Sequence, residues 1–156
     1  MSGGAGDPQR HETPAERSDR LWNDLLQELR VMQTGAQLTG GFLLTLPFQQ
    51  RFGDLSVAQH RFYLGLVALA AVVTALVMTP IAMHRRLAGR HVKERLVEAT
   101  RQVMRFVLLS LGLLVLATTT FVFDVVTGTA TAAVAAALLG VLLVSLLVVV
   151  PRRLVD

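Results

Sequence analysis

Polar and hydrophobic residues alternate along this chain in long blocks, and four of the blocks are strongly apolar. They cover residues 31–48, 62–83, 106–123 and 130–150, and none of them contains Lys, Arg, Asp, Glu or His. A helix needs about 20 mainly apolar residues to cross the hydrocarbon core of a bilayer. The pattern therefore predicts an all-α integral membrane protein, a four-helix bundle of two transmembrane hairpins in residues 31–153.

The residues before the first apolar block predict a tail followed by an amphipathic helix. Residues 1–12 are rich in glycine and charge, which is typical of a disordered tail. Thr13, Pro14 and Glu16 then form a helix-start signal, with Thr13 and Glu16 spaced as a capping box. Apolar residues recur at helical spacing through residues 13–30. We expect this segment either to lie in the cytoplasmic headgroup layer or to pack on the cytoplasmic ends of the other helices, and either to bend before the first block or to run straight into it.

The placement of the basic residues predicts an orientation. The chain has 15 Lys and Arg against 11 Asp and Glu, a formal net charge of +4. All the basic residues except Arg51 and Arg61 lie before the first block, between the second and third, or after the fourth. Because loops rich in Lys and Arg stay in the cytoplasm, both termini are predicted to be cytoplasmic, in a multi-pass protein of the inner (plasma) membrane. These residues would contact anionic lipid headgroups, and no interleaving of aromatic and basic residues points to nucleic acid.

Few residues offer catalytic or metal-binding chemistry. The chain has no cysteine, which excludes disulfides, thiolate catalysis and cysteine-ligated metals. Its four histidines are scattered, and no acid stands beside them at the spacing of a third metal ligand. No Ser-His-Asp arrangement and no phosphate-binding loop is visible in the sequence. We therefore expect no enzyme activity, no cofactor and no metal.

The first apolar block contains a polar face. Its side chains are Gln33, Thr34, Gln37 and Thr45, and the small residues Gly35 and Gly41 lie among them. An unpaired amide is costly in hydrocarbon, so this face should turn toward other helices. Two roles fit. The glutamines bond across to a neighbouring helix that the glycines allow to approach, or the face lines a polar path or a ligand niche.

The fourth apolar block carries small residues at intervals of four. Ala132, Ala136 and Gly140 share one side of the predicted helix. This spacing is typical of close helix packing in membranes. The partner helix belongs either to the same chain or to another copy.

Three stretches of sequence carry a resemblance: LLQELRVMQTGAQ at residues 25–37, FLLTLPF at 42–48 and TPIAMHR at 79–85. Together they resemble a family of short, four-span, mainly actinobacterial membrane proteins that is catalogued as a domain of unknown function. Some of its members carry the label sodium:proton antiporter. The resemblance covers most of the chain after the tail and implies a bacterial membrane protein, without functional residues to transfer.

The antiporter label draws attention to acidic residues, because ion-coupled carriers usually hold an ionisable group inside the membrane. The four blocks contain none, and the candidate ion-coupling acids are Asp124 at the outer boundary and Glu28 at the inner one. We therefore expect a non-enzymatic membrane protein that packs with, or modulates, other membrane components, as a homo-oligomer or beside other membrane proteins. The alternatives are a small oligomeric ion transporter or channel of the antiporter type, and a lipid-headgroup sensor that uses the basic central segment.

Overall fold

The protein is described by a computed structural model, which covers residues 13–87 and 93–155. Within these residues the chain is helical and contains no strand, so the predicted all-α fold is confirmed. The long helices are α1 Pro14–Thr45, α2 Val57–Leu87, α3 Lys93–Thr127 and α4 Thr129–Val144. The short elements are the 3-10 helices η1 Leu46–Phe48 and η2 Gln50–Asp54, the π-helix η3 Ser145–Val149 and the last helix α5 Val150–Val155. The predicted tail at residues 1–12 lies outside the described part of the chain.

Three helical segments of the described chain are long and apolar enough to cross a membrane. They are Val57–Pro80, Thr100–Thr127 and Thr129–Arg153, which correspond to the second, third and fourth apolar blocks. The last of them is a continuous helical path through α4, η3 and α5. The stretch of α1 that holds the first apolar block is not among the three, and its glutamines, threonines and glycines explain its lower hydropathy.

α1 begins at the predicted capping box. The backbone N–H of Glu16 donates to the Thr13 hydroxyl at 3.3 Å, and the backbone N–H of Thr13 donates to the Glu16 carboxylate at 2.9 Å. These two bonds satisfy backbone donors that have no partner within the first turn of a helix. From this start α1 runs without interruption to Thr45, so the amphipathic segment and the first apolar block form one straight-through helix.

The amphipathic part of α1 packs on the other helices. Leu25 and Leu29 are buried in one cluster with Val77 of α2 and with Met104 and Val107 of α3. Burial of such side chains stabilises the packed arrangement by removing apolar surface from water. Of the two locations left open by the sequence, the structure therefore shows packing on the neighbouring helices.

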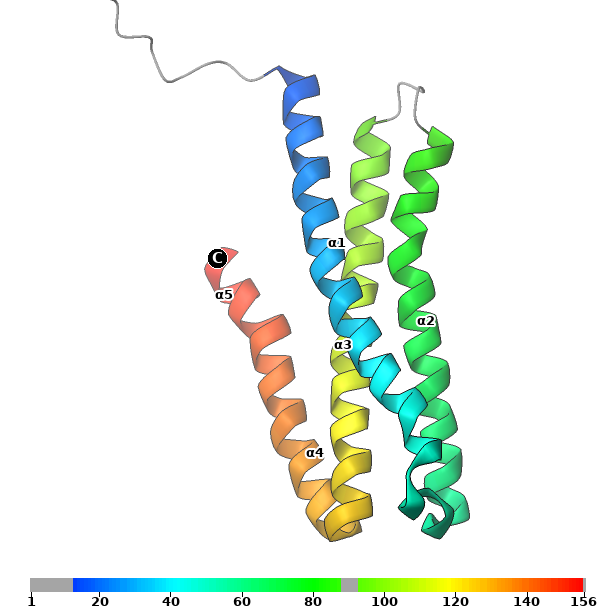
Figure 1. The fold of residues 1–156 in the computed structure, drawn as a ribbon. Coiled ribbons are helices and arrows are strands. Elements are labelled where there is room, and N and C mark those ends of the chain that lie inside the picture. The colour runs from blue at the N-terminus through cyan, green and yellow to red at the C-terminus, as the bar shows by residue number, and fades with distance from the viewer. Residues whose placement is uncertain (1–12, 88–92, 156) are drawn as a thin grey trace, which may run out of the picture.

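The helices form a three-helix bundle with a fourth helix along one side. α1, α2 and α3 pack on one another, whereas α4 packs chiefly on α3. Figure 1 shows α4 leaving α3 at an angle from their shared turn, so that α5 ends apart from the first three helices. The predicted four-helix bundle is therefore not confirmed.

The molecule has two distinct ends (Figure 1). The η1–η2 segment and the turn from α3 into α4 lie at one of them, here called the turn end, and α1 and α3 begin toward the other, here called the tail end. Gly128 has a φ of 92°, a left-handed value that favours glycine. Its conformation lets α4 start at Thr129 immediately after α3 ends at Thr127, so the second connection at the turn end is a single residue.

Candidate functional site

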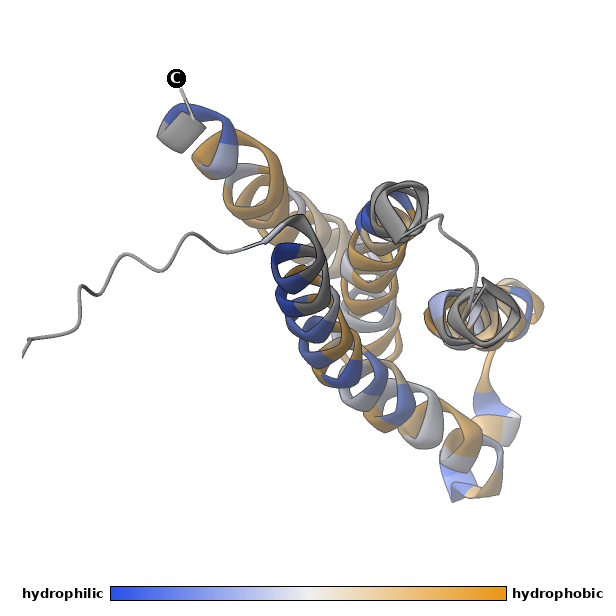
Figure 2. Ribbon diagram, turned by 90° about the horizontal axis from the view of Figure 1, so that it is seen from above, coloured by the Kyte–Doolittle hydropathy of each residue, from blue (hydrophilic) through white to orange (hydrophobic). Residues whose placement is uncertain are grey.

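The predicted polar face of α1 lies on the outside of the molecule. Thr34, Gln37 and Thr45 are exposed, and Gln33 is half-buried. Figure 2 shows hydrophilic positions along the length of α1, whereas α4 is hydrophobic almost throughout. Among the described residues, no other helix of the same chain covers Thr34, Gln37 or Thr45, so the expected contact of this face with other helices is not made inside one chain.

The physical reason is that α1 is amphipathic over its whole length. Its other side carries the buried residues Leu25, Leu29, Ala36 and Leu43. That apolar side offers closer packing to α2 and α3 than a face of amides and hydroxyls does. The inner side of α1 is thus occupied, and the polar face is left at the surface.

The threonines of this face satisfy themselves locally, but Gln37 does not. The hydroxyls of Thr34 and Thr45 donate to the backbone carbonyls of Arg30 at 2.9 Å and Phe42 at 2.7 Å. Such bonds to a preceding turn remove the need for an outside partner. Within the described part of the chain, no hydrogen bond engages the side-chain amide of Gln37. The amide has two donors and an acceptor, so it is the strongest unmet polar demand at the exposed positions of this face; the amide of the half-buried Gln33 likewise makes no hydrogen bond among the described residues.

The glycines of α1 differ in what they face. A Cβ atom added at Gly35 would lie 3.8 Å from Leu111 of α3, and one added at Gly40 would lie 3.7 Å from Ala70 of α2. A Cβ atom at Gly41 would have no neighbour within 4 Å among the described residues. Gly35 and Gly40 therefore lie at contacts inside the chain, whereas Gly41 extends the exposed polar face.

The small residues of α4 lie on its contact with α3. Ala132 is buried, Ala136 is half-buried, and a Cβ atom at Gly140 would lie 3.9 Å from Leu116 of α3. Between the two partners left open by the sequence, the structure places a helix of the same chain against Gly140. Gly112 of α3 faces back across the same contact, since a Cβ atom there would lie 3.2 Å from Leu147. Sequence analysis missed Gly112, because one glycine in an apolar block gives no periodic signal.

The turn end is held by a bond that sequence analysis also missed. The Tyr63 hydroxyl donates to the backbone carbonyl of Leu43 at 3.0 Å, and both residues are buried. In a regular helix this carbonyl would accept from the N–H four residues later, but residue 47 is proline and has no N–H. The N–H of Leu46 also donates to this carbonyl, and Tyr63 supplies the second donor in place of the N–H that Pro47 lacks. Pro47 was the available signal, because each buried carbonyl needs a partner.

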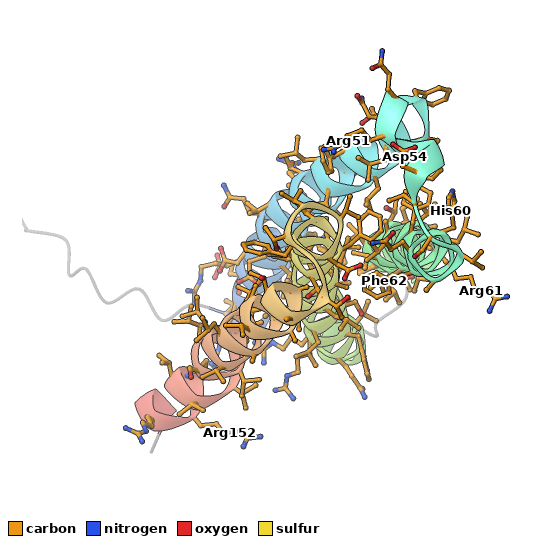
Figure 3. All side chains as sticks on the ribbon, turned by 90° about the horizontal axis from the view of Figure 1, so that it is seen from below. Arg51, Asp54, His60, Arg61, Phe62 and Arg152 are labelled. Atoms are coloured by element: carbon orange, nitrogen blue, oxygen red, sulfur yellow. The ribbon has the colours of Figure 1, made fainter. Side chains whose placement is uncertain are left out.

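Aromatic rings surround this bond. Phe52 of η2 makes edge-on contacts with Tyr63 and His60, each with ring centroids 5.0 Å apart. Phe121 of α3 lies 6.2 Å from Tyr63, again between centroids. Figure 3 shows Arg51, Asp54 and His60 gathered where the chain turns from α1 into α2. The η1–η2 segment therefore closes over the ends of α1 and α2.

Asp124 lies near the same end, in the last turns of α3. Its carboxylate accepts a hydrogen bond from the side-chain amide of Gln59 in α2 at 2.8 Å, and the pair is partly buried. The bond joins the two predicted hairpins across a separation of 65 residues. The carboxylate predicted as an ion-coupling acid is therefore a partner in a contact between helices.

Glu28, the other candidate acid, lies near the tail end. It is exposed, and it borders a cleft between α1 and α3 together with Arg101 and Arg105. Glu28 and Asp124 are thus on opposite ends of the bundle, and the structure does not bring them together. Within the described residues, no three or more His, Asp and Glu side chains are grouped as metal ligands.

Comparison with known proteins gives one match. A family model described as a family of unknown function (DUF6328) matches residues 11–151. No curated protein matches the chain, and no solved structure does. The resemblance to an uncharacterised family, seen first in the sequence, is confirmed.

Proposed function

The chain belongs to the DUF6328 family, and we propose that it is a non-enzymatic inner-membrane protein whose α1 packs laterally against other transmembrane helices. The first partner we infer is a second copy of the same chain. The observation that carries the proposal is the exposed amide of Gln37, which makes no hydrogen bond with any other described residue of its chain.

The depth of Gln37 follows from helix geometry. Ten residues separate it from Pro47, at which α1 gives way to η1, so it lies about 15 Å from the turn end. The hydrocarbon core of a bilayer is about 30 Å thick. With α1 crossing beside α2 and α3, the amide is therefore near the middle of the bilayer, where water cannot satisfy it.

A second α1 face is a suitable partner. Thr34, Gln37, Gly41 and Thr45 repeat at intervals of three and four residues, the spacing of a helix-packing seam. Two glutamines that meet across a two-fold axis donate and accept with each other. Gly41 leaves room for the close approach, and interhelical bonds of this kind contribute about 0.6–2 kcal/mol.

Disulfide cross-linking tests the proposal, because the natural chain has no cysteine. Single cysteines introduced along residues 30–48 should give cross-linked dimers with maxima at 34, 37, 41 and 45. Val72→Cys, on an exposed position of α2, is the matched control and should stay monomeric. Equal cross-linking along α1 and α2, or none at all, would contradict the proposal.

Substitution of Gln37 distinguishes helix packing from other roles of the polar face of α1. Gln37→Leu should reduce the dimer fraction in mild detergent while the monomer remains folded, and Val72→Ala should leave that fraction unchanged. If Gln37→Leu keeps the dimer and the protein still loses its cellular function, the face lines a path or a ligand niche instead. Sodium-driven dissipation of a pH gradient in sealed vesicles, above that of empty vesicles, would favour the transporter alternative.

A further inference from the structure

Two clefts flank one ridge of α3 near the tail end. The first has a volume of about 480 Å³, lies between α1 and α3, and is lined in part by Val31 and Met104. The second has a volume of about 610 Å³, lies between α3 and the η3–α5 segment, and is lined in part by Leu147. Arg105 and Leu108 line both clefts, so they form the ridge between the two.

The clefts combine apolar walls with basic rims. Arg101 borders the first cleft, Arg152 borders the second, and Arg105 borders both. All three guanidinium-bearing residues are exposed. Glu28 is the acidic residue of the first cleft, and none lines the second. Arginines exceed acids around the pair, so the site is complementary to an anion.

The arginines are at the depth of lipid headgroups. From Arg105 to Thr127, α3 rises about 33 Å, which is close to the thickness of a bilayer core. The helical path from Thr129 back to Arg152 has nearly the same length, about 34 Å. Leu108 and Leu147 lie about one turn deeper than Arg105 and Arg152, and thus at the depth of acyl chains.

We propose that Arg105 and the two clefts beside it bind one diacyl anionic phospholipid. Its phosphate bonds to the Arg105 guanidinium, with Arg101 and Arg152 on either side. One acyl chain lies in each cleft, so that Leu108 separates the two chains. A planar guanidinium matches phosphate oxygens with two parallel hydrogen bonds, and basic sites between helices are suited to anionic headgroups.

The lipid would also fill the space that the angle of α4 creates. α4 and α5 diverge from the other helices toward the tail end (Figure 1), and the second cleft lies on that side of α3. Acyl chains there would cover apolar surface of α3 and η3 that no other described helix covers. The proposal rests on the membrane insertion proposed above, but it does not depend on self-association.

Lipid retention by the purified full chain tests this site. Native mass spectrometry in mild detergent should show one phosphatidylglycerol per chain at low lipid concentration. Phosphatidylcholine with the same acyl chains should be retained at least about tenfold more weakly, and glycerol phosphate without chains should not be retained. Equal retention of the two lipids, or retention of glycerol phosphate alone, would overturn the proposal.

Variants of the ridge give the matched comparison. Arg105→Gln should weaken phosphatidylglycerol binding at least about tenfold. Arg30→Gln makes the same charge change on α1, outside both clefts, and should leave binding unchanged. Equal loss in both variants would mean that the lipid responds to overall charge, and the site would be refuted.

A variant that binds phosphatidylglycerol more tightly gives a further test, because misfolding would weaken binding and could not produce this result. Glu28→Gln removes the acid from the first cleft, so it should tighten phosphatidylglycerol binding. A weaker or unchanged affinity would contradict the assignment of the phosphate to this rim. Cysteine cross-linking along α1, measured on the same variants, reports self-association separately, so failure of the lipid site and failure of the α1 contact can be told apart.

Discussion

At the scale of single residues, Tyr63 and Pro47 act as a pair. Pro47 removes the N–H that would bond to the Leu43 carbonyl, and the Tyr63 hydroxyl bonds to it from α2. The N–H of Leu46 reaches the same carbonyl within the last turn of α1. The carbonyl has two lone pairs, so both donors are accommodated. Because Pro47 has no N–H, the Leu43 carbonyl can accept the hydrogen bond that Tyr63 donates from α2.

Removal of the Tyr63 hydroxyl should therefore lower the free energy of unfolding most when residue 47 is proline. Tyr63→Phe should lower the free energy of unfolding by about 1 kcal/mol, since the bond is buried and neutral. Pro47→Ala restores an N–H four residues after Leu43, and in that background Tyr63→Phe should cost clearly less. Thermal or denaturant unfolding in one detergent measures both. An identical cost in the two backgrounds would mean that the hydroxyl does not replace the missing donor.

Gln59 and Asp124 form the second residue-scale contact. Bonds to a charged acceptor contribute about 1.5–3 kcal/mol when they are shielded from water, and somewhat less when they are partly exposed. Asp124→Ala and Gln59→Ala should each destabilise the protein, and the double variant should lose less than the sum of the two. A double-mutant cycle measures this coupling. Strict additivity would show that the two side chains act independently.

At the scale of elements, the helical path through α4, η3 and α5 contains a π-helical segment for an identifiable reason. Pro151 has no N–H, so the carbonyl of Leu147 cannot be satisfied in the α-helical pattern. The chain widens beforehand into η3, where the N–H of Val150 bonds to the carbonyl of Ser145, five residues earlier. In this region Leu147 packs on Gly112 of α3. The π-segment and the glycine are therefore parts of one contact.

A larger side chain at position 112 should loosen the contact between α3 and the helical path through α4, η3 and α5. A Cβ atom there would be 3.2 Å from Leu147, so Gly112→Ala requires a small shift and Gly112→Val a larger one. We expect Gly112→Val to cost about 1–3 kcal/mol through overpacking. Gly65→Val is the control, because the described structure has open space beside Gly65. Similar losses of unfolding free energy in both variants would show that helix propensity dominates over packing at Gly112.

The sequence predicts these elements unevenly. Apolar blocks reveal α2, α3 and α4, because only long runs without charge can occupy hydrocarbon. The capping box locates the start of α1 at Pro14 for an equally local reason. The outward direction of Gln37 could not be predicted in this way. In a membrane, lipid and neighbouring helices are both apolar, so periodicity shows that α1 has two faces without showing which one its own chain covers. Contacts across helices, such as Tyr63 with Leu43, depend on a tertiary arrangement that local patterns do not specify.

At the scale of the whole molecule, the apolar surface is unevenly covered. α3 contacts every other long helix, whereas α4 contacts chiefly α3 and exposes large residues such as Leu138 and Val141. In water this surface would favour aggregation, but lipid covers it without cost. α1 is more mixed, because its outward surface combines the polar Thr34 and Gln37 with exposed apolar side chains such as Leu38, while its inward side is apolar. The number of membrane crossings therefore depends on whether α1 crosses the membrane together with the three apolar helical segments.

Single cysteines on either side of the first apolar block decide this point. With four crossings, Ser56→Cys and Thr127→Cys should react with an impermeant thiol reagent on intact cells, and Arg17→Cys and Arg153→Cys should react only after permeabilisation. The placement of Lys and Arg predicts this outcome, because Arg17, Arg20 and Arg30 precede the first apolar block while Arg51 and Arg61 follow it, and the larger group stays in the cytoplasm. With three crossings, α1 would not span, and Arg17→Cys would be labelled from outside together with Ser56→Cys. Labelling of Arg153→Cys from outside would instead show that the whole protein has the opposite orientation to the predicted one. Arg17 and Ser56, on the two sides of the first apolar block, thus report on the crossing itself, and Thr127 with Arg153 reports on the direction of the last helix.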